Sequence, residues 1–122
     1  MNDVRNVNTH TKLAVLIKDA YIWANVCYGV NLPALPLTLS EKELGGDWAG
    51  ILFTDNEPKK ILANPKLMSL PFIDRDSIIK HEILHVTAWK LGHDYHDGSV
   101  WFESEAISHM LPNMLFSFSE NM

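Results

Sequence analysis

The sequence predicts a single α+β domain, in which helices and a small sheet occupy separate parts of the chain. Before residue 29 and again between residues 78 and 91, apolar residues recur at the spacings of three and four that are typical of helices. Between these segments, short apolar runs alternate with turn formers, which is typical of strands. The 122 residues are 47% hydrophobic and 20% charged, which is enough for one core.

The first element is a helix that we expect to begin at Thr11 and to run to about Tyr28, with Gly29 in the stop position. Residues 1–10 are polar and are predicted to form a flexible or loosely docked arm, so that the domain proper spans 11–122. The apolar positions of the helix are Leu13, Leu16, Ile17, Ala20, Ala24 and Cys27, and its aromatic residues, Tyr21, Trp23 and Tyr28, are expected to pack in the core.

A small sheet is predicted next, because Pro33 and Pro36 exclude a helix and three short apolar runs follow them. The turn formers of residues 54–58 predict that the second and third strands pair as a hairpin. After the sheet, Asn64 and Pro65 introduce a single helical turn. The predicted strands are 37–40, 49–53 and 59–64.

A second long helix is expected from about Ile78 to Leu91, and Gly92 supplies its stop signal. Asp and Ser residues in 73–77 provide the capping chemistry of a helix start. A last helix is predicted over residues 99–111, before Pro112. The apolar tail 114–118 is expected to cover the core rather than to contact a partner.

Composition limits the possible functions. Cys27 is the only cysteine, which excludes an intramolecular disulfide and a cysteine zinc ribbon. The net charge of -5 argues against a strong sequence-independent grip on nucleic acid, which needs clusters of basic residues. Without a secretory signal or a stretch of membrane-spanning length, the chain is expected to be cytoplasmic and to have no membrane partner.

The sequence His81-Glu82-Ile83-Leu84-His85 is the motif that points to chemistry. Residues four apart lie on one face of a helix, so the imidazoles of His81 and His85 can bind the same metal ion. Glu82 is turned by about 100° from His81, which lets its carboxylate reach a water at the metal. An enclosed helix with these three polar groups needs partners for them, and a zinc ion with its water would satisfy all three.

A third metal ligand is required, because catalytic zinc usually takes three protein ligands and leaves one position for water. Three downstream residues are candidates. His96 lies in a turn-rich loop, and His93 follows the end of the helix closely. Glu105 lies on the last predicted helix, an arrangement that resembles the thermolysin-like peptidases.

The order of these segments resembles the SprT-like zinc peptidases, the family that includes the Spartan proteases. The resemblance spans about residues 25–112 and rests on four segments, Ala49-Gly50, residues 61–68, the motif with Trp89-Lys90 and Gly92, and Tyr95-His96-Asp97 followed by Trp101. It implies a zincin-like fold, with the N-terminal helix, the sheet, the motif helix and a C-terminal helix. It also implies that His96 is the third ligand. From the residues after the motif, we expect neither the C-terminal zinc ribbon nor the DNA-binding extension that many of these relatives carry.

The function expected from the motif is that of a zinc metalloendopeptidase that cleaves protein or peptide substrates, with Glu82 as general base. By analogy with the family, the substrates could be proteins bound to DNA, although the acidic charge does not support this. Two other interpretations remain at this point. The zinc could stabilise a non-catalytic protein-binding module, or His81 and His85 could be core histidines without a metal.

Overall fold

The computed structural model describes residues 3–93 and 95, with side chains from residue 8 onward. These residues form an α+β fold with two α-helices and a three-stranded mixed sheet, which confirms the predicted fold class. The last predicted helix and the apolar tail lie outside the described residues. The elements are α1 (Asp3–Tyr28), β1 (Leu37–Leu39), β2 (Ala49–Thr54), β3 (Glu57–Ala63), the 3₁₀ helix η1 (Pro65–Ser69) and α2 (Phe72–Lys90).

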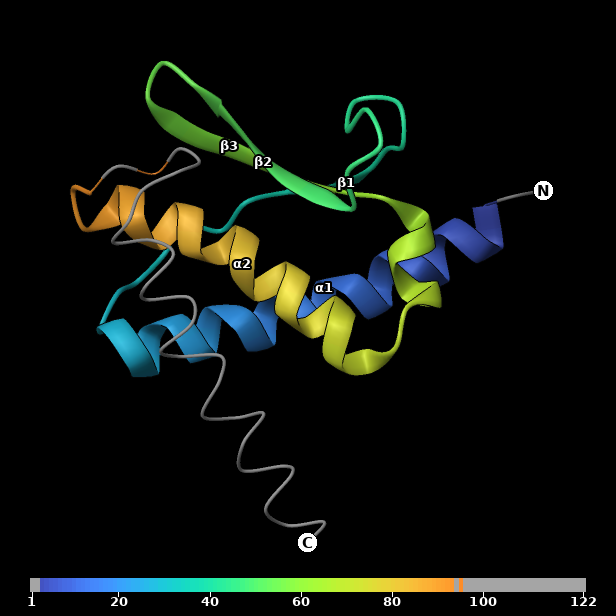
Figure 1. The fold of residues 1–122 in the computed structure, drawn as a ribbon, viewed down its shortest axis with the longest axis horizontal. Coiled ribbons are helices and arrows are strands. Elements are labelled where there is room, and N and C mark those ends of the chain that lie inside the picture. Colours follow the sequence, from blue (N-terminus) through green and yellow to red (C-terminus); the bar gives the residue numbers. More distant parts are fainter. Residues whose placement is uncertain (1–2, 94, 96–122) are drawn as a thin grey trace, which may run out of the picture.

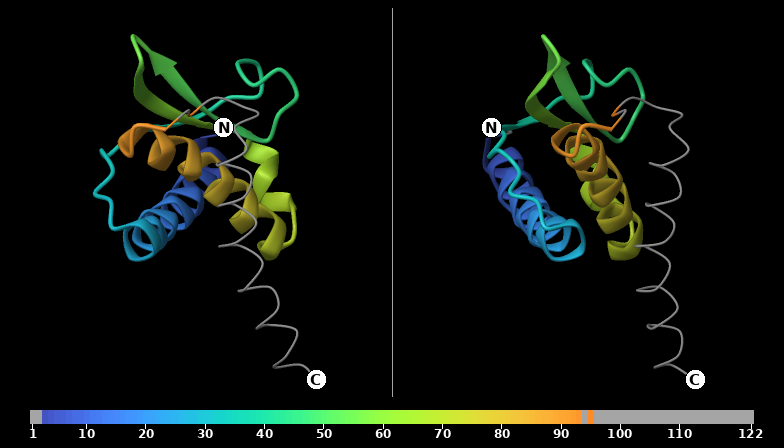
Figure 2. Two further views of the ribbon diagram at one scale, coloured as in Figure 1. Left: turned by 60° about the vertical axis from the view of Figure 1, so that its left-hand side comes forward. Right: turned by 90° about the vertical axis from the view of Figure 1, so that its left-hand side faces the viewer.

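The sheet and the two helices form two layers (Figure 1). Figure 2 shows α1 and α2 side by side on one face of the sheet. Within this arrangement α2 packs against β2, whereas α1 packs against β1 and α2. The core therefore lies between the helices and this face of the sheet, and β2 is the strand nearest to α2.

The strands are ordered β1-β3-β2, so β3 is central. β2 and β3 form the predicted antiparallel hairpin, and β1 pairs parallel to β3. The hairpin turns at Asp55 and Asn56, which have φ angles of 56° and 62°, as in the primed turns that match the twist of a hairpin. The register shifts between Leu52 and Phe53, opposite Pro58, where a residue without an N–H cannot complete the ladder.

Helix α1 begins at Asp3 rather than at Thr11, so the prediction that residues 1–10 precede the helix as an arm was wrong for residues 3–10. These residues contain no glycine or proline to interrupt a helix, and the helix continues through them. At this end of α1, Nε2 of His10 lies 3.0 Å from the carbonyl oxygen of Leu37. That contact links the helix to β1.

The apolar face of α1 was predicted correctly. Five of its six predicted positions are buried, and Cys27 is partly buried. The hydroxyl of Tyr21 donates to the carbonyl of Pro33 at 2.7 Å, and the rings of Trp23 and Tyr28 meet edge to face. These aromatic residues pack against the core, as expected. The buried positions are Leu13, Leu16, Ile17, Ala20 and Ala24.

Helix α2 begins at Phe72, before the expected capping residues. Pro71 occupies the N-cap position and makes no side-chain capping bond, so proline rather than Asp or Ser marks this helix start. The C-terminal end of α2 agrees with the stop signal predicted at Gly92. Gly92 has a φ of +79°, its N–H bonds the carbonyl of Trp89, and the N–H of His93 bonds that of Ala88. These are the two bonds of a Schellman motif.

The link between the sheet and α2 is also as predicted, a single 3₁₀ turn. The side chain of Asn64 caps this turn by accepting the N–H of Lys66 at 2.9 Å, and Pro65 follows at its first position. Leu67 in this turn is fully buried and anchors the link in the core. In the described part of the chain, none of the helices has the length and apolar character needed to cross a bilayer.

Candidate metal centre

Helix α2 brings His81, Glu82 and His85 together. The ligand atoms of these three side chains all lie within 4.8 Å of one another. The two imidazole rings are 5.2 Å apart between centroids and are inclined by 79°, so they meet edge to face instead of stacking. His81 is exposed, Glu82 is partly buried and His85 is buried. The group is therefore open to solvent on one side and anchored in the protein on the other.

The orientation of His85 is set by a backbone contact. Its Nδ1 lies 2.6 Å from the carbonyl oxygen of Tyr95. Because a carbonyl only accepts, Nδ1 must carry the proton, and the lone pair of the neutral ring is then on Nε2. Metal-binding histidines in general use their other ring nitrogen in this way to fix tautomer and ring orientation. His85 thus has the arrangement of a ligand that binds through Nε2.

A pocket of about 690 Å³ opens at this group. Its floor is α2, and one wall is β2, which lies over that helix in Figure 1. The rest of the wall comes from residues that precede β2 and from Tyr95. The lining residues are Asp47, Trp48, Ala49, Gly50, Ile51, Phe53, Ser77, Ile78, His81, Glu82, His85 and Tyr95.

The wall formed by β2 presents backbone groups as well as side chains. The N–H of Asn64 donates to the carbonyl of Trp48, so this pair is a hydrogen-bonded pair of the antiparallel ladder. Since such pairs alternate with non-hydrogen-bonded ones, the backbone groups of Ala49 and Ile51 point away from β3, toward the outer edge of β2. No described strand pairs with that edge. It can accept an extended peptide by strand addition.

The three candidates for a third ligand have different outcomes. His93 is exposed, and it is not a member of the metal-binding group found among the described residues. His96 and Glu105 lie outside the described residues. Tyr95, the residue before His96, contacts both His85 and the hairpin. The chain thus returns to the motif one residue before His96.

The donor set fits a divalent transition metal. Two imidazoles and a carboxylate are ligand types that zinc accepts, and hard cations such as Ca²⁺ would need six or more oxygens instead. The partly buried Glu82 lies beside the two histidines, so a carboxylate is available either to bind a metal or to accept a proton from a water near it. The site can therefore hold a metal and place a base next to it.

Some residues of the site were not recognised in the sequence. Tyr95 contributes through its backbone carbonyl, which carries no residue-specific signal. Asn56 looked like an ordinary turn former, yet its side chain accepts the hydroxyl of Tyr95 at 3.0 Å. Trp48 lines the pocket from the loop before β2. The aromatic residue at position 95, in a polar loop after the motif helix, was the one available hint.

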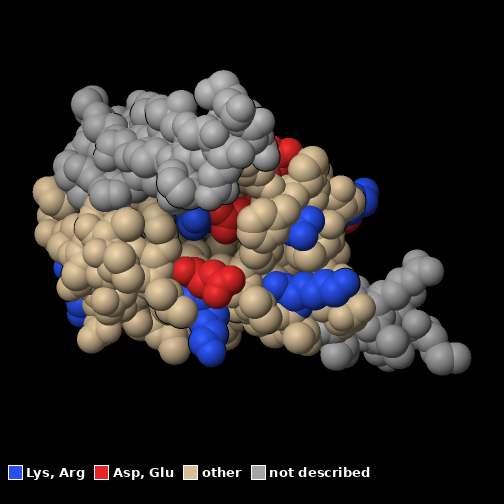
Figure 3. All heavy atoms as spheres, turned by 90° about the horizontal axis from the view of Figure 1, so that it is seen from below, with Lys and Arg blue, Asp and Glu red and all other residues tan. Residues whose placement is uncertain are grey.

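Charged side chains are mixed on the protein surface. On the face shown in Figure 3, Lys and Arg side chains lie interspersed with Asp and Glu. That face has no continuous basic area among the described residues. Within the described part of the chain, ion pairs join Lys80 to Asp76 at 2.9 Å and Lys60 to Glu43 at 3.4 Å.

No protein-family model, curated protein or solved structure was found that matches this chain. The grouping of His81, Glu82 and His85 beside an outer strand edge is therefore the feature that points to a function.

Proposed function

We propose that this protein is a zinc-dependent metallopeptidase of the SprT-like type, which hydrolyses peptide bonds in protein substrates. The observation that supports this best is the group on α2, in which two histidines and a glutamate come within 4.8 Å of one another at the floor of a pocket. A site that only stabilised the fold would gain nothing from an open pocket next to a partly buried carboxylate. Hydrolysis needs both the open pocket, which admits a substrate, and the carboxylate, which accepts a proton.

In the proposed mechanism, His81 and His85 hold the zinc and Glu82 is the general base. A bound zinc ion would act as a Lewis acid that polarises the scissile carbonyl and lowers the pKa of a water toward about 7. Glu82 accepts the proton of the attacking water and passes it to the leaving amine. Its position one residue after His81, inside the pocket, suits this transfer.

The substrate would bind as an extended strand along the outer edge of β2. Backbone groups of Ala49 and Ile51 point to that edge, so they can pair with a peptide irrespective of its sequence. Such pairing requires an unfolded or flexible segment, because a folded substrate has its backbone groups already bonded. Apolar side chains of Trp48, Ile51 and Ile78 line the pocket and would favour apolar substrate residues.

His96 is proposed as the third zinc ligand. The contact of Tyr95 with His85 is consistent with a chain path that returns to the motif just before His96. Zinc affinity measured for His96→Ala, Glu105→Ala and His93→Ala should fall strongly for the first variant alone. A large loss in Glu105→Ala with an unchanged His96→Ala would instead assign the thermolysin-like set.

Metal-dependent cleavage tests the proposed function. An unfolded, fluorescently labelled protein should be cleaved by the zinc-loaded chain, protected after chelation, and cleaved again when zinc is restored. His81→Ala should be inactive, and because His81 is exposed, its circular dichroism spectrum should match that of the wild type. The exposed His10, which lies on α1, offers a matched His10→Ala control that should stay active. Cleavage that survives both chelation and His81→Ala would refute the proposal.

A further inference from the structure

The contact between Tyr95 and His85 depends on a cluster of side chains at the tip of the β2–β3 hairpin. Tyr95 follows α2, and its ring stacks on that of Phe53 with 4.3 Å between centroids and 22° between planes. Its hydroxyl donates to Oδ1 of Asn56 at 3.0 Å. Ring stacking and this hydrogen bond together hold both ends of the Tyr95 side chain, so the backbone at residue 95 is held as well.

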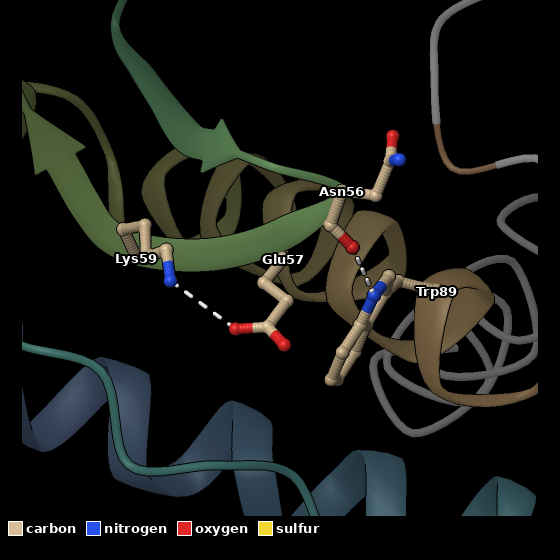
Figure 4. Close-up of polar contacts among 4 residues, drawn as sticks. All are labelled: Asn56, Glu57, Lys59 and Trp89. Atoms are coloured by element: carbon tan, nitrogen blue, oxygen red, sulfur yellow. Dashed lines mark hydrogen bonds and ion pairs between the residues drawn. The ribbon is translucent and has the colours of Figure 1, made fainter.

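The hairpin tip is in turn attached to α2 itself. The indole N–H of Trp89 donates to the carbonyl of Asn56 at 2.8 Å (Figure 4). In the same view the side chain of Asn56 points away from the indole, which leaves its amide oxygen for Tyr95. Asn56 thus bonds α2 through its backbone and the loop after α2 through its side chain. We call Phe53, Asn56, Trp89 and Tyr95 the hairpin clamp.

We propose that the hairpin clamp is a positioning device for the metal site, and that Tyr95 and Asn56 act on zinc binding through His85. This inference rests on the proposed function, because it assumes that His85 binds zinc through Nε2. The clamp holds the Tyr95 carbonyl 2.6 Å from Nδ1 of His85, where it keeps the proton on that nitrogen and fixes the ring. A sequence-distant turn thereby sets the geometry of a ligand on α2.

The arrangement is specific for these residue types. Asn56 has a φ of 62°, a conformation that asparagine, aspartate and glycine tolerate better than other residues do. Glycine would keep the turn and lose the acceptor, whereas aspartate would keep both. Phenylalanine at position 95 would keep the stacking on Phe53 and lose the hydroxyl. The hydrogen bond can therefore be removed from either side without straining the backbone.

The test compares Tyr95→Phe, Asn56→Gly and the double variant with wild type in the full-length chain. Zinc affinity, measured by competition with a chromogenic chelator, should fall up to about tenfold in each single variant, the low end of the range seen when a partner of a metal ligand is removed, because the Tyr95 carbonyl stays and loses only its support. The double variant should lose no more than either single one, because both changes remove the same bond. Asn56→Asp should bind zinc like the wild type.

Nuclear magnetic resonance of the metal-free protein gives a second readout. In the wild type, ¹⁵N shifts of the His85 ring should report the tautomer protonated at Nδ1, and Tyr95→Phe should show a mixture of tautomers. Tyr21→Phe is the matched control, since it also removes a hydrogen bond that a tyrosine hydroxyl donates, in this case to the carbonyl of Pro33, but Tyr21 lies outside the pocket lining. It should leave zinc affinity and tautomer unchanged.

The outcomes separate this inference from the proposed function. Equal zinc affinity and the same tautomer in wild type, Tyr95→Phe and Asn56→Gly would overturn the positioning role and leave the peptidase proposal intact. A wild-type chain that binds no zinc would overturn the proposed function, whatever the tautomer of His85. An equal loss of affinity in Tyr21→Phe would attribute the effect to general destabilisation and also overturn the inference.

Discussion

Ile83 lies between the two histidines of the motif and is fully buried in the main core cluster. Replacing it by alanine removes three buried carbon atoms and leaves a cavity between α2 and its neighbours. We expect Ile83→Ala to lower the free energy of unfolding by about 2–5 kcal/mol, measured by urea denaturation. Val26→Ala is the matched control, because Val26 is 78% exposed, and its effect should stay within about 0.5 kcal/mol. Equal losses in the two variants would contradict the described core.

Cys27 permits a prediction about pH. Burial raises the pKa of its thiol, and the positive charge of Lys80 offsets part of that rise. Since the thiolate is the reactive form, alkylation by iodoacetamide at neutral pH should be slower than for a cysteine in a short peptide, and the pH at which its rate is half-maximal should lie above the usual thiol pKa of about 8.5. Alkylation at pH 7 as fast as in the peptide would contradict the burial of this thiol. Denatured protein supplies the control and should react like the peptide.

At the residue scale, the sequence predicted His81, Glu82 and His85 because their spacing places them on one helical face regardless of the rest of the fold. The contact from Tyr95 to His85 was beyond such reasoning, since it joins a backbone carbonyl to a ring across a loop. Side-chain spacing carries information along one element. It carries none about which carbonyl a loop will present.

The end of α2 supports a prediction at the scale of the element. Gly92 has a φ of +79°, and a Cβ there would meet no atom within 4 Å. The cost of Gly92→Ala therefore comes from backbone conformation alone, and we expect a loss of about 1 kcal/mol in the free energy of unfolding. Gly92→Asn should cost less, because asparagine enters this region more readily. A neutral alanine variant would argue against the Schellman motif at this helix end.

Element types were predictable, but two helix starts were not. Strand, hairpin and 3₁₀ positions followed from turn formers and prolines, which act locally. Both α1 and α2 begin earlier than expected. Thr11 and the Asp and Ser residues of 73–77 are able to cap a helix, but the residues between them and the observed helix starts include no glycine or proline, so each helix continues through them. Pro71 is the residue beyond which α2 does not extend toward the N-terminus. A possible cap is thus weaker information than a proline.

For the whole molecule, zinc binding should be linked to stability. A ligand that binds only the folded chain adds about 2.7 kcal/mol at a free concentration one hundred times its dissociation constant. The melting temperature of the wild type should therefore rise with zinc, and that of His81→Ala should not. His10→Ala again serves as control and should respond like the wild type. A melting temperature that is insensitive to zinc would contradict a folded-state zinc site.

The sheet order was the part of the fold that local patterns could not give. Strands β2 and β3 are joined by a short turn, so their pairing was predictable, whereas β1 pairs in parallel with β3 across a long connection. That pairing places β2 at the edge, next to α2. The proposed substrate edge thus arises from a non-local contact, and the metal motif from a local one.

The central claim is that Glu82 acts as the base beside zinc held by His81 and His85. It is tested most directly by the cleavage rate of Glu82→Gln at the same bound zinc per chain as the wild type. Loss of a general base predicts a rate at least about a hundredfold lower with zinc retained, and Glu41→Gln, a surface control, should cleave normally. Undiminished cleavage by zinc-loaded Glu82→Gln would contradict the account.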